Sequence, residues 1–271
     1  LMRARANDLR GIVNGIDYDD FNPETDPYIA QQYNAKNFRK EKAKNKLALQ
    51  EELGLARDDK KFMIGIVSRL TDQKGLDLIQ CVMDEICTDD VQLVVLGTGD
   101  DKYENMFRHY DWKYHDRVSA QIYYSEPMSH KIYAACDAFL MPSLFEPCGL
   151  SQLMALRYGT VPIVRETGGL KDTVWPYNEY EGTGTGFSFA NYNAHEMLNI
   201  IRYAKYIYYN KSVNGTRSWT GIWRWIFPGI HPQENTRSCT TGCWGTRECS
   251  LEETMETVSY THLRAHETKA N

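Results

Sequence analysis

The sequence predicts an α/β fold: a doubly wound parallel sheet of the Rossmann-like kind, with helices on both faces. The first observation is a set of short, continuous apolar runs of strand length, at 62–67, 91–96, 138–141 and 161–164. Such runs indicate strands that are buried on both faces, as in parallel sheets. The second observation is that helical patterns separate these runs, so that strand and helix alternate along the chain. Ligands of such sheets bind beyond the carboxyl ends of the strands.

The first expected helix is rich in lysine, beginning near Arg39 and ending before Gly54, a residue suited to a helix C-terminus. Its lysines could bind phosphate, but a solvated helix face is the better interpretation. A further strand should end at Ile122-Tyr123. The remaining expected helices cover 76–87, 102–114, 129–135, 149–158 and 193–209.

A glycine-rich stretch at 182–186 precedes a short strand, Phe187–Phe189. It lacks the strand-then-helix context of a dinucleotide-binding fingerprint, so we interpret it as a connector.

Composition excludes several classes of protein. The chain has 271 residues, a formal net charge of −5, 42% hydrophobic and 25% charged residues. These are values of an ordinary soluble protein, and the acidic balance argues against non-specific nucleic-acid binding. No apolar run is long enough to cross a membrane and no signal peptide opens the chain, so we expect a bacterial cytoplasmic protein. The first residue is Leu1, and the opening sequence resembles the middle of a longer protein.

The seven cysteines fall into two groups. Cys81, Cys87, Cys136 and Cys148 are scattered through expected helix, strand and turn, which suits reduced thiols. The other three lie close together near the end of the chain, at 239, 243 and 249, without the histidine pair or second CxxC of a zinc site. We therefore expect no metal and no cofactor.

The most informative stretch is FEPCGLSQ, at 145–152, which follows the expected strand 138–141 and opens a helix. Pro147 fixes the turn, and Gly149 allows close approach of a ligand or another backbone. Glu146 provides a carboxylate for sugar hydroxyls, beside helix N–H groups that attract an anion. This combination suits a sugar nucleotide, although Glu146 could instead be a helix-capping acid.

Two cations, Arg69 and Lys74, follow the expected strand 62–67 at the same edge of the sheet. Arginine offers a forked set of donors and lysine a compact charge, so both could hold the same phosphate groups. The alternative is that they are surface residues near the start of the next helix.

Four segments in order resemble bacterial glycogen synthases and plant starch synthases: GIVNGIDYDDFNP at 11–23, SRLTDQKG at 68–75, IYYSEPMSHKIYAACDAFLMPS at 122–143, and FEPCGLSQL followed by MALRYGTVPIVRETGGLKDTV at 145–174. The similarity covers about residues 9–209. Many related transferases carry a second glutamate eight positions after Glu146, where this chain has Met154. Glycogen synthases commonly lack that glutamate too. Its absence here therefore favours glycogen synthases among the related transferases and does not weaken the resemblance.

The resemblance implies the second, donor-binding domain of a GT-B type glycosyltransferase. It assigns catalytic roles to Arg69 and Lys74, which bind the diphosphate in place of a metal ion, and to Glu146. It also implies a donor-binding set consisting of Tyr124, which stacks on the base, the backbone around Cys148, Gly149, Leu150 and Ser151, and the turn Thr167, Gly168 and Gly169. Tyr124 could alternatively be part of the core.

The same resemblance divides the chain into three parts. Residues 1–16 are expected to cross over from a missing N-terminal domain, residues 17–210 to bind the donor, and residues 211–271 to be an out-of-frame, disordered tail. In the tail, shifting the reading frame by one nucleotide around Trp223 and Trp225 allows codons that encode an amphipathic helical sequence. That sequence resembles the C-terminal end of glycogen synthases. The last residues resemble a translated sequencing adaptor. A natural disordered tail is the alternative.

By resemblance, the complete enzyme transfers glucose from ADP-glucose to the non-reducing end of an α-1,4-glucan, with retention of configuration. The glucan acceptor would bind mainly to the missing domain, so this chain alone should be inactive. Three alternatives stay open: UDP in place of ADP as the nucleotide, another retaining transferase of sucrose or trehalose synthase type, and a non-catalytic nucleotide-binding module.

Overall fold

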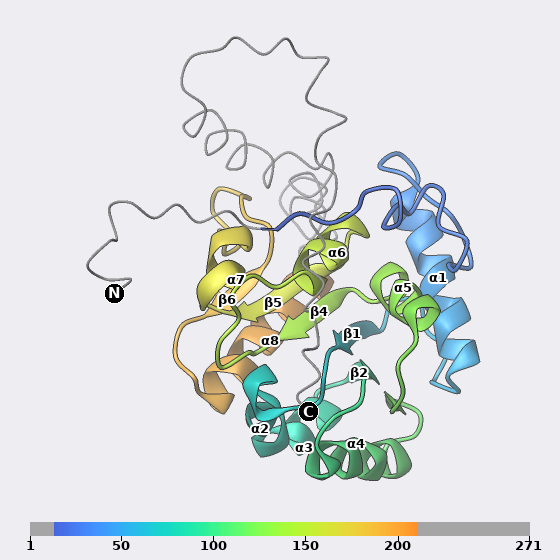
Figure 1. The fold of residues 1–271 in the computed structure, drawn as a ribbon. Helices are drawn as coiled ribbons and strands as arrows, with labels where there is room; N and C mark the ends of the chain where they lie inside the picture. Colours follow the sequence, from blue (N-terminus) through green and yellow to red (C-terminus); the bar gives the residue numbers. More distant parts are fainter. Residues whose placement is uncertain (1–13, 211–271) are drawn as a thin grey trace, which may run out of the picture.

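The computed structural model describes residues 14–210, which form a six-stranded parallel sheet between two layers of helices (Figure 1). The strands are β1 (Phe62–Val67), β2 (Val91–Leu96), β3 (Val118–Gln121), β4 (Ala138–Met141), β5 (Val161–Arg165) and β6 (Phe187–Phe189). Their order across the sheet is β3-β2-β1-β4-β5-β6, and all five neighbouring pairs are parallel. The predicted fold class is thereby confirmed.

The helices divide between the two faces of the sheet. α2 (Leu76–Cys81), α3 (Met83–Thr88), α4 (Asp101–Lys113) and α8 (Ala194–Asn210) supply residues to the largest core cluster. The opposite face carries α5 (Glu126–Ala135), α6 (Ser151–Arg157) and α7 (Gly168–Thr173), with α1 (Phe38–Glu52) packed outside α5. Because successive residues of a strand point to opposite faces, β1, β2, β4 and β5 contribute to the core on both faces of the sheet.

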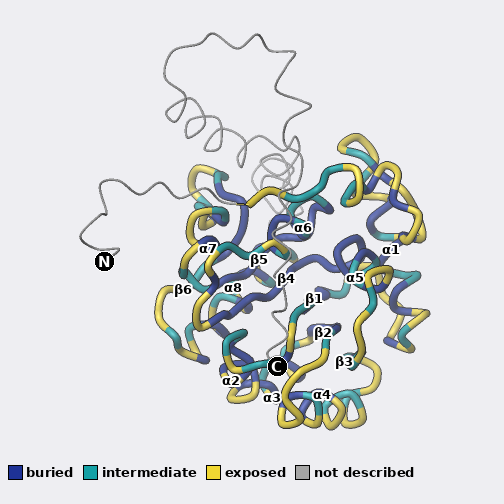
Figure 2. Tube along the Cα trace, in the orientation of Figure 1, coloured by how far each residue is buried: buried dark blue, intermediate teal, exposed yellow. Residues whose placement is uncertain are grey.

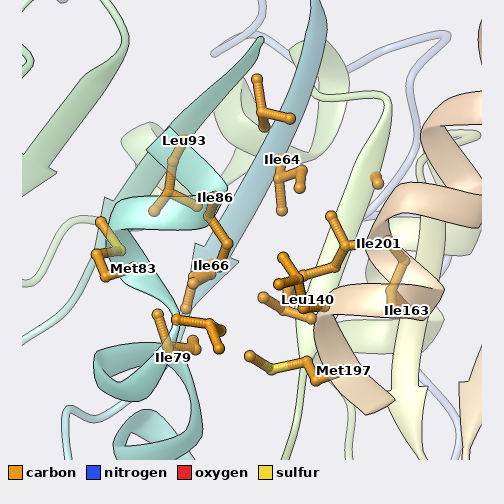
Figure 3. Packing of buried hydrophobic residues seen from close by; sticks show 14 of the residues in the cluster. Ile64, Ile66, Ile79, Met83, Ile86, Leu93, Leu140, Ile163, Met197 and Ile201 are labelled. Carbon is orange, nitrogen blue, oxygen red and sulfur yellow. The ribbon is translucent and has the colours of Figure 1, made fainter. Parts of the chain in front are cut away.

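Strand β1 shows this alternation. Ile64 and Ile66 lie in the core with α2, α3 and α8, together with Leu140 and Ile163 (Figure 3). Met63 faces the other way, into the cluster that includes Ile132 of α5. The central strands are buried along their length (Figure 2), which explains why their sequences are continuous apolar runs.

Several element boundaries differ from the prediction. The helix expected over 76–87 is two helices, broken at Val82, where the backbone leaves the helical region (φ −123°, ψ 21°). β3 ends at Gln121 and not at Tyr123. α5 starts at Glu126, ahead of the expected Ser129, because the Ser125 side chain accepts a hydrogen bond from the Met128 N–H at 3.2 Å. α7 was expected only as a turn.

The prediction that the α1 lysines are solvated is wrong for two of them: Lys42 and Lys46 are 4% and 2% exposed. The Lys42 ammonium donates to the carbonyls of Tyr133 (3.1 Å), Ala134 (2.9 Å) and Tyr158 (3.2 Å), and to Thr160 Oγ1 at 2.7 Å. The first two carbonyls close α5 and the third follows α6, so one cation satisfies the ends of two helices. Burial lowers the pKa of Lys42 to about 7, against the opposing effect of Asp137.

Lys46 lies one turn further along α1 and forms a buried ion pair with Asp137, with Nζ to Oδ2 at 2.6 Å. It also donates to the carbonyls of Asp59 and Lys61, both at 3.0 Å. The same Asp137 oxygen accepts from the Met63 N–H at 2.8 Å, and the Asp137 carbonyl accepts from the Val161 N–H at 2.9 Å. Lys46 and Asp137 therefore connect the amino ends of β1, β4 and β5.

A second buried polar group fastens the leading segment, defined here as residues 14–37, to α5 and α6. Asp26 Oδ2 lies 2.7 Å from His130 Nδ1 and also accepts from the Tyr158 hydroxyl. The ring of Phe21 stacks on His130 with centroids 4.7 Å apart. Burial alone would raise the pKa of Asp26, but hydrogen bonds from His130 and Tyr158 outweigh it, and the pKa is lowered. The leading segment is thus part of the folded unit although it contains no regular helix or strand.

We expect the Lys42→Met variant to lose a pH dependence of stability. Between the folded pKa of about 7 and the ordinary value of 10.5, the unfolded chain holds a proton at Lys42 that the folded chain does not. The wild type should therefore become more stable relative to the variant as pH rises through this window, by roughly 1 kcal/mol per pH unit. Urea unfolding at pH 7, 8 and 9 measures this.

The matched control is Lys40→Met, which changes an exposed lysine of the same helix. Its unfolding free energy should follow the wild type across the same pH range. Parallel curves for the wild type and Lys42→Met would contradict the assignment.

Candidate functional site

The topology places the site where β1 and β4 lie side by side. From this pair the strand order runs to β2 and β3 on one side, and to β5 and β6 on the other. The connections that leave β1 and β4 diverge at such a switch point, which is where ligands of doubly wound sheets bind. Lys74 follows β1, and Glu146 follows β4.

The turn that carries Lys74 is fixed by direct backbone packing on the neighbouring loop. It forms a short 3₁₀ helix, η2 (Asp72–Lys74), followed by Gly75 with φ +72°. A Cβ at Gly75 would lie 2.0 Å from the Pro142 carbonyl oxygen, so a side chain cannot be accommodated there. The Leu144 N–H donates to the Gln73 carbonyl at 2.9 Å, which joins the turn to the loop after β4.

Lys74 and Glu146 form an ion pair, with Nζ to Oε2 at 2.6 Å. Their side chains are 18% and 9% exposed, so the pair is largely shielded from bulk water. Ser143 adds a long contact from its hydroxyl to the same carboxylate oxygen at 3.4 Å. A cation and a carboxylate are thereby held together at the switch point.

The turn Thr167–Gly169 packs against the loop that carries Glu146. Gly168 has φ +45°, and a Cβ there would lie 2.1 Å from the Glu146 carbonyl oxygen. The Gly169 N–H donates to that carbonyl at 3.1 Å and to the Pro147 carbonyl at 3.3 Å. The structure thus brings the TGG turn and the Glu146 loop into direct contact.

The segment from Cys148 to Ser151 leads into α6. Because the helix begins at Ser151, Gly149 and Leu150 precede it, and Gly149 has φ +72°. The side-chain amide of Gln152 donates to the carbonyls of Cys148 (3.1 Å) and Gly149 (3.0 Å). Both carbonyls are therefore engaged with α6 itself.

Arg69 and Tyr124 stand apart from this cluster. Within residues 14–210, no hydrogen bond or ion pair joins the Arg69 side chain to Lys74 or Glu146, and Arg69 is exposed. Tyr124 follows β3, the outermost strand, and is 87% exposed, so it does not belong to the core. Both lie beyond carboxyl ends of strands, on the same edge as Glu146.

Sequence reasoning missed three residues that shape the Glu146 loop: Ser143, Gln152 and Arg165. Arg165 ends β5 and donates from Nε to the Ser143 carbonyl at 2.8 Å. A charged residue at the carboxyl end of a buried strand was the signal that could have drawn attention to it. Gln152 is fully buried, which its position in an expected helix did not reveal.

Residues 14–210 contain no group of three or more His, Cys, Asp or Glu side chains arranged to hold a metal ion. None of the helices in this part of the chain combines the length and apolar character needed to cross a membrane.

The model of the family described as glycosyl transferases group 1 matches residues 51–206, which include Lys74, Glu146 and the TGG turn. The chain belongs to this family. The match covers every strand of the sheet.

Curated relatives of this chain carry the name glycogen synthase. The protein of Lachnospira eligens is 77% identical over 222 residues, which are 82% of this chain and 46% of the relative. That of Clostridium acetobutylicum is 58% identical over 214 residues, 79% of this chain and 45% of the relative. The resemblance to glycogen synthases is confirmed. The chain spans about half the length of the curated relatives it matches.

Solved structures agree. The catalytic domain of Starch Synthase IV from Arabidopsis thaliana, bound to ADP and acarbose, is 32% identical, with a TM-score of 0.79, over 89% of this chain and 49% of that one. The C-terminal domain of a group 1 glycosyl transferase from Francisella tularensis is 13% identical, with a TM-score of 0.54, over 82% of this chain and 98% of that domain. This second likeness concerns the fold alone.

We expect Gly168→Ala to disturb the site, because the new Cβ would meet the Glu146 carbonyl at 2.1 Å and φ is positive. The predicted loss of unfolding free energy is about 2–4 kcal/mol, since strain at a left-handed position adds to a backbone clash. Chemical denaturation measures it.

Gly54→Ala is the matched control, with φ +69° and nothing within 4 Å of a Cβ. It should cost about 1 kcal/mol, the penalty of the left-handed conformation alone. Equal losses for the two variants would show that the contact between Gly168 and the Glu146 loop is unimportant.

Proposed function

We propose that this chain is the donor-binding part of a glycogen synthase, which transfers glucose from ADP-glucose to the non-reducing end of an α-1,4-glucan with retention of configuration. The observation that carries the proposal is the Lys74–Glu146 pair at the switch point of the sheet. Support also comes from the 77% identity to a glycogen synthase and from the likeness to a starch synthase bound to ADP and acarbose.

The chemistry of the donor explains the residue types. A sugar nucleotide leaves as a nucleoside diphosphate, so negative charge grows on phosphate oxygens in the transition state. Fixed cations stabilise that charge without reorganising, and in this proposal Arg69 and Lys74 perform this role. Glu146 accepts hydrogen bonds from sugar or ribose hydroxyls. Lys74 holds the Glu146 carboxylate in place through their ion pair.

The remaining assignments concern the base and the phosphate loops. The exposed ring of Tyr124 offers a flat face on which a nucleobase can stack. The backbone around Cys148, Gly149, Leu150 and Ser151, with the turn Thr167, Gly168 and Gly169, surrounds the phosphates. The glycines allow a ligand to approach the backbone closely.

The glucan acceptor is assigned to the other half of the complete enzyme. Transfer requires donor and acceptor to be held in a productive geometry, and this orientation supplies a large part of the rate enhancement. We therefore assign donor binding to this chain, and transfer to the complete enzyme.

We expect the 271-residue chain to bind ADP with the same affinity in magnesium and in EDTA, because protein cations neutralise the diphosphate. Arg69→Ala should weaken binding by about 1.5–3 kcal/mol, the loss typical of a hydrogen bond to a charged group. Isothermal titration calorimetry with ADP measures both effects. Competition between ADP and UDP in the same cell decides the preferred base.

Arg202→Ala serves as the control, since Arg202 pairs with Asp89 on another part of the surface. It should bind ADP like the wild type. Binding that requires magnesium, or equal losses in the two variants, would refute the roles given to Arg69 and Lys74.

We also expect no glucosyl transfer above background by this chain alone, because the acceptor-side groups are assigned to the other half of the enzyme. Incorporation of radiolabelled glucose from ADP-glucose into glycogen provides the measurement. Measurable incorporation by the purified chain would show that it holds a complete active site.

A further inference from the structure

The loop that carries Glu146 is held through its carbonyl groups. The Gly169 N–H binds the carbonyls of Glu146 and Pro147, and the Gln152 amide binds those of Cys148 and Gly149. At the start of the loop, the carbonyls of Ser143 and Leu144 are bound by a single side chain, Arg165. Its Nε donates to Ser143 at 2.8 Å, and its NH2 group donates to Leu144.

Arg165 suits this task because its guanidinium is a rigid, planar fork. The two carbonyls belong to consecutive residues and are reached by two different nitrogens of the same plane. The third nitrogen lies 3.4 Å from the Ala190 carbonyl, in the segment between β6 and α8. One side chain therefore joins the loop after β4 to the end of β5 and to the segment after β6.

Tyr192 extends this connection to the turn that carries Lys74. The Arg165 guanidinium lies over the Tyr192 ring, 5.5 Å from its centroid. The Tyr192 hydroxyl donates to the Asp77 carboxylate. Asp77 lies in the first turn of α2, three residues after Lys74. A continuous path thus runs from the Glu146 loop through Arg165 and Tyr192 to the helix that follows Lys74.

We propose that Arg165 and Tyr192 form a bracket that sets the distance between the Glu146 loop and the Lys74 turn, and that Arg165 is a positioning residue for diphosphate binding. The inference rests on the proposed function for the identity of the ligand. The proposed function gives Arg165 and Tyr192 no contact with phosphate or sugar, so their role here is additional to it.

The bracket is needed because the two site loops leave different strands. β1 and β4 pair through only two positions, Ile64 with Ala138 and Gly65 with Phe139, both before the strands end. Beyond that point the turn and the loop are joined by the contact of Gly75 with the Pro142 carbonyl, by two bonds of Gln73 (its carbonyl to the Leu144 N–H, its side-chain amide to the Phe145 carbonyl), and by the Lys74–Glu146 pair. Arg165 binds the carbonyls of Ser143 and Leu144. It therefore stiffens the loop whose residues contact the Lys74 turn.

The test uses the 271-residue chain with Arg165→Met, which keeps the apolar stem and removes the fork. Hydrogen exchange should rise in peptides that cover 143–150, while peptides from β1 and β2 stay protected. ADP affinity should fall about tenfold, which corresponds to ~1.4 kcal/mol. AMP lacks the second phosphate, so its binding depends mainly on the base. Its affinity for Arg165→Met should therefore differ from that for the wild type by less than about twofold.

Three further variants complete the experiment. Arg165→Lys keeps the charge without the fork and should lie between the wild type and Arg165→Met. Tyr192→Phe removes only the hydroxyl bond to Asp77, so exchange should rise around 71–78. Arg202→Met removes a guanidinium that binds Asp89 elsewhere and should match the wild type in all measurements.

The outcomes separate the bracket from the proposed function. Unchanged exchange at 143–150 in Arg165→Met overturns the bracket, as does an equal loss of ADP and AMP affinity with increased exchange throughout the chain. If the wild type does not bind ADP, the proposed function fails, and the exchange data alone decide the bracket. If Arg165→Met does not fold, Arg165→Lys and Tyr192→Phe decide it by the same criteria.

Discussion

The two buried ammonium groups of α1 hold together the end of the sheet that lies opposite the site. Lys42 binds the last carbonyls of α5 and the one that follows α6, while Lys46 and Asp137 join the starts of β1, β4 and β5. Removing a lysine charge from water costs several kcal/mol. At Lys46 a carboxylate at 2.6 Å opposes that cost. At Lys42 the carbonyls at helix C-termini oppose it only in part, because burial still lowers the pKa of this lysine to about 7. Both α5 and α6 begin at the site edge of the sheet and end at this lysine.

The site at that other edge depends on backbone contacts and glycines. Gly75 lies against the Pro142 carbonyl and Gly168 against that of Glu146, so the loops touch where a side chain would keep them apart. This close packing forms a small cluster in which the Lys74 ammonium and the Glu146 carboxylate meet. An arrangement held by backbone contacts reorganises little when charge changes nearby, which is the property that favours stabilisation of a departing diphosphate.

The sequence was sufficient for the strands because burial on both faces produces continuous apolar runs, and β1 and β2 have the predicted bounds. It was also sufficient to place Lys74 and Glu146 at the same edge of the sheet, since each follows a strand there. It was insufficient for Lys42, whose partners lie 91 to 118 positions away along the chain. A lysine-rich helix has the same appearance whether its cations meet water or distant carbonyls. For the same reason, the bonds from Arg165 to the Glu146 loop could be identified only after β4 and β5 were placed side by side.

The leading segment shows that the folded unit begins before its first regular element, α1. Asp26, Phe21 and Tyr28 surround His130 before α1 begins, and the Tyr33 hydroxyl donates to the Tyr158 carbonyl at 2.8 Å. A chain cut at the start of α1 would leave the His130 ring without these neighbours, on a helix whose preceding loop carries Tyr124. Upstream of these residues, the Tyr18 ring lies 5.2 Å from the Arg157 guanidinium, which also donates to the Phe21 carbonyl. The folded unit therefore extends well before α1, and it is held there by side chains of α5 and α6.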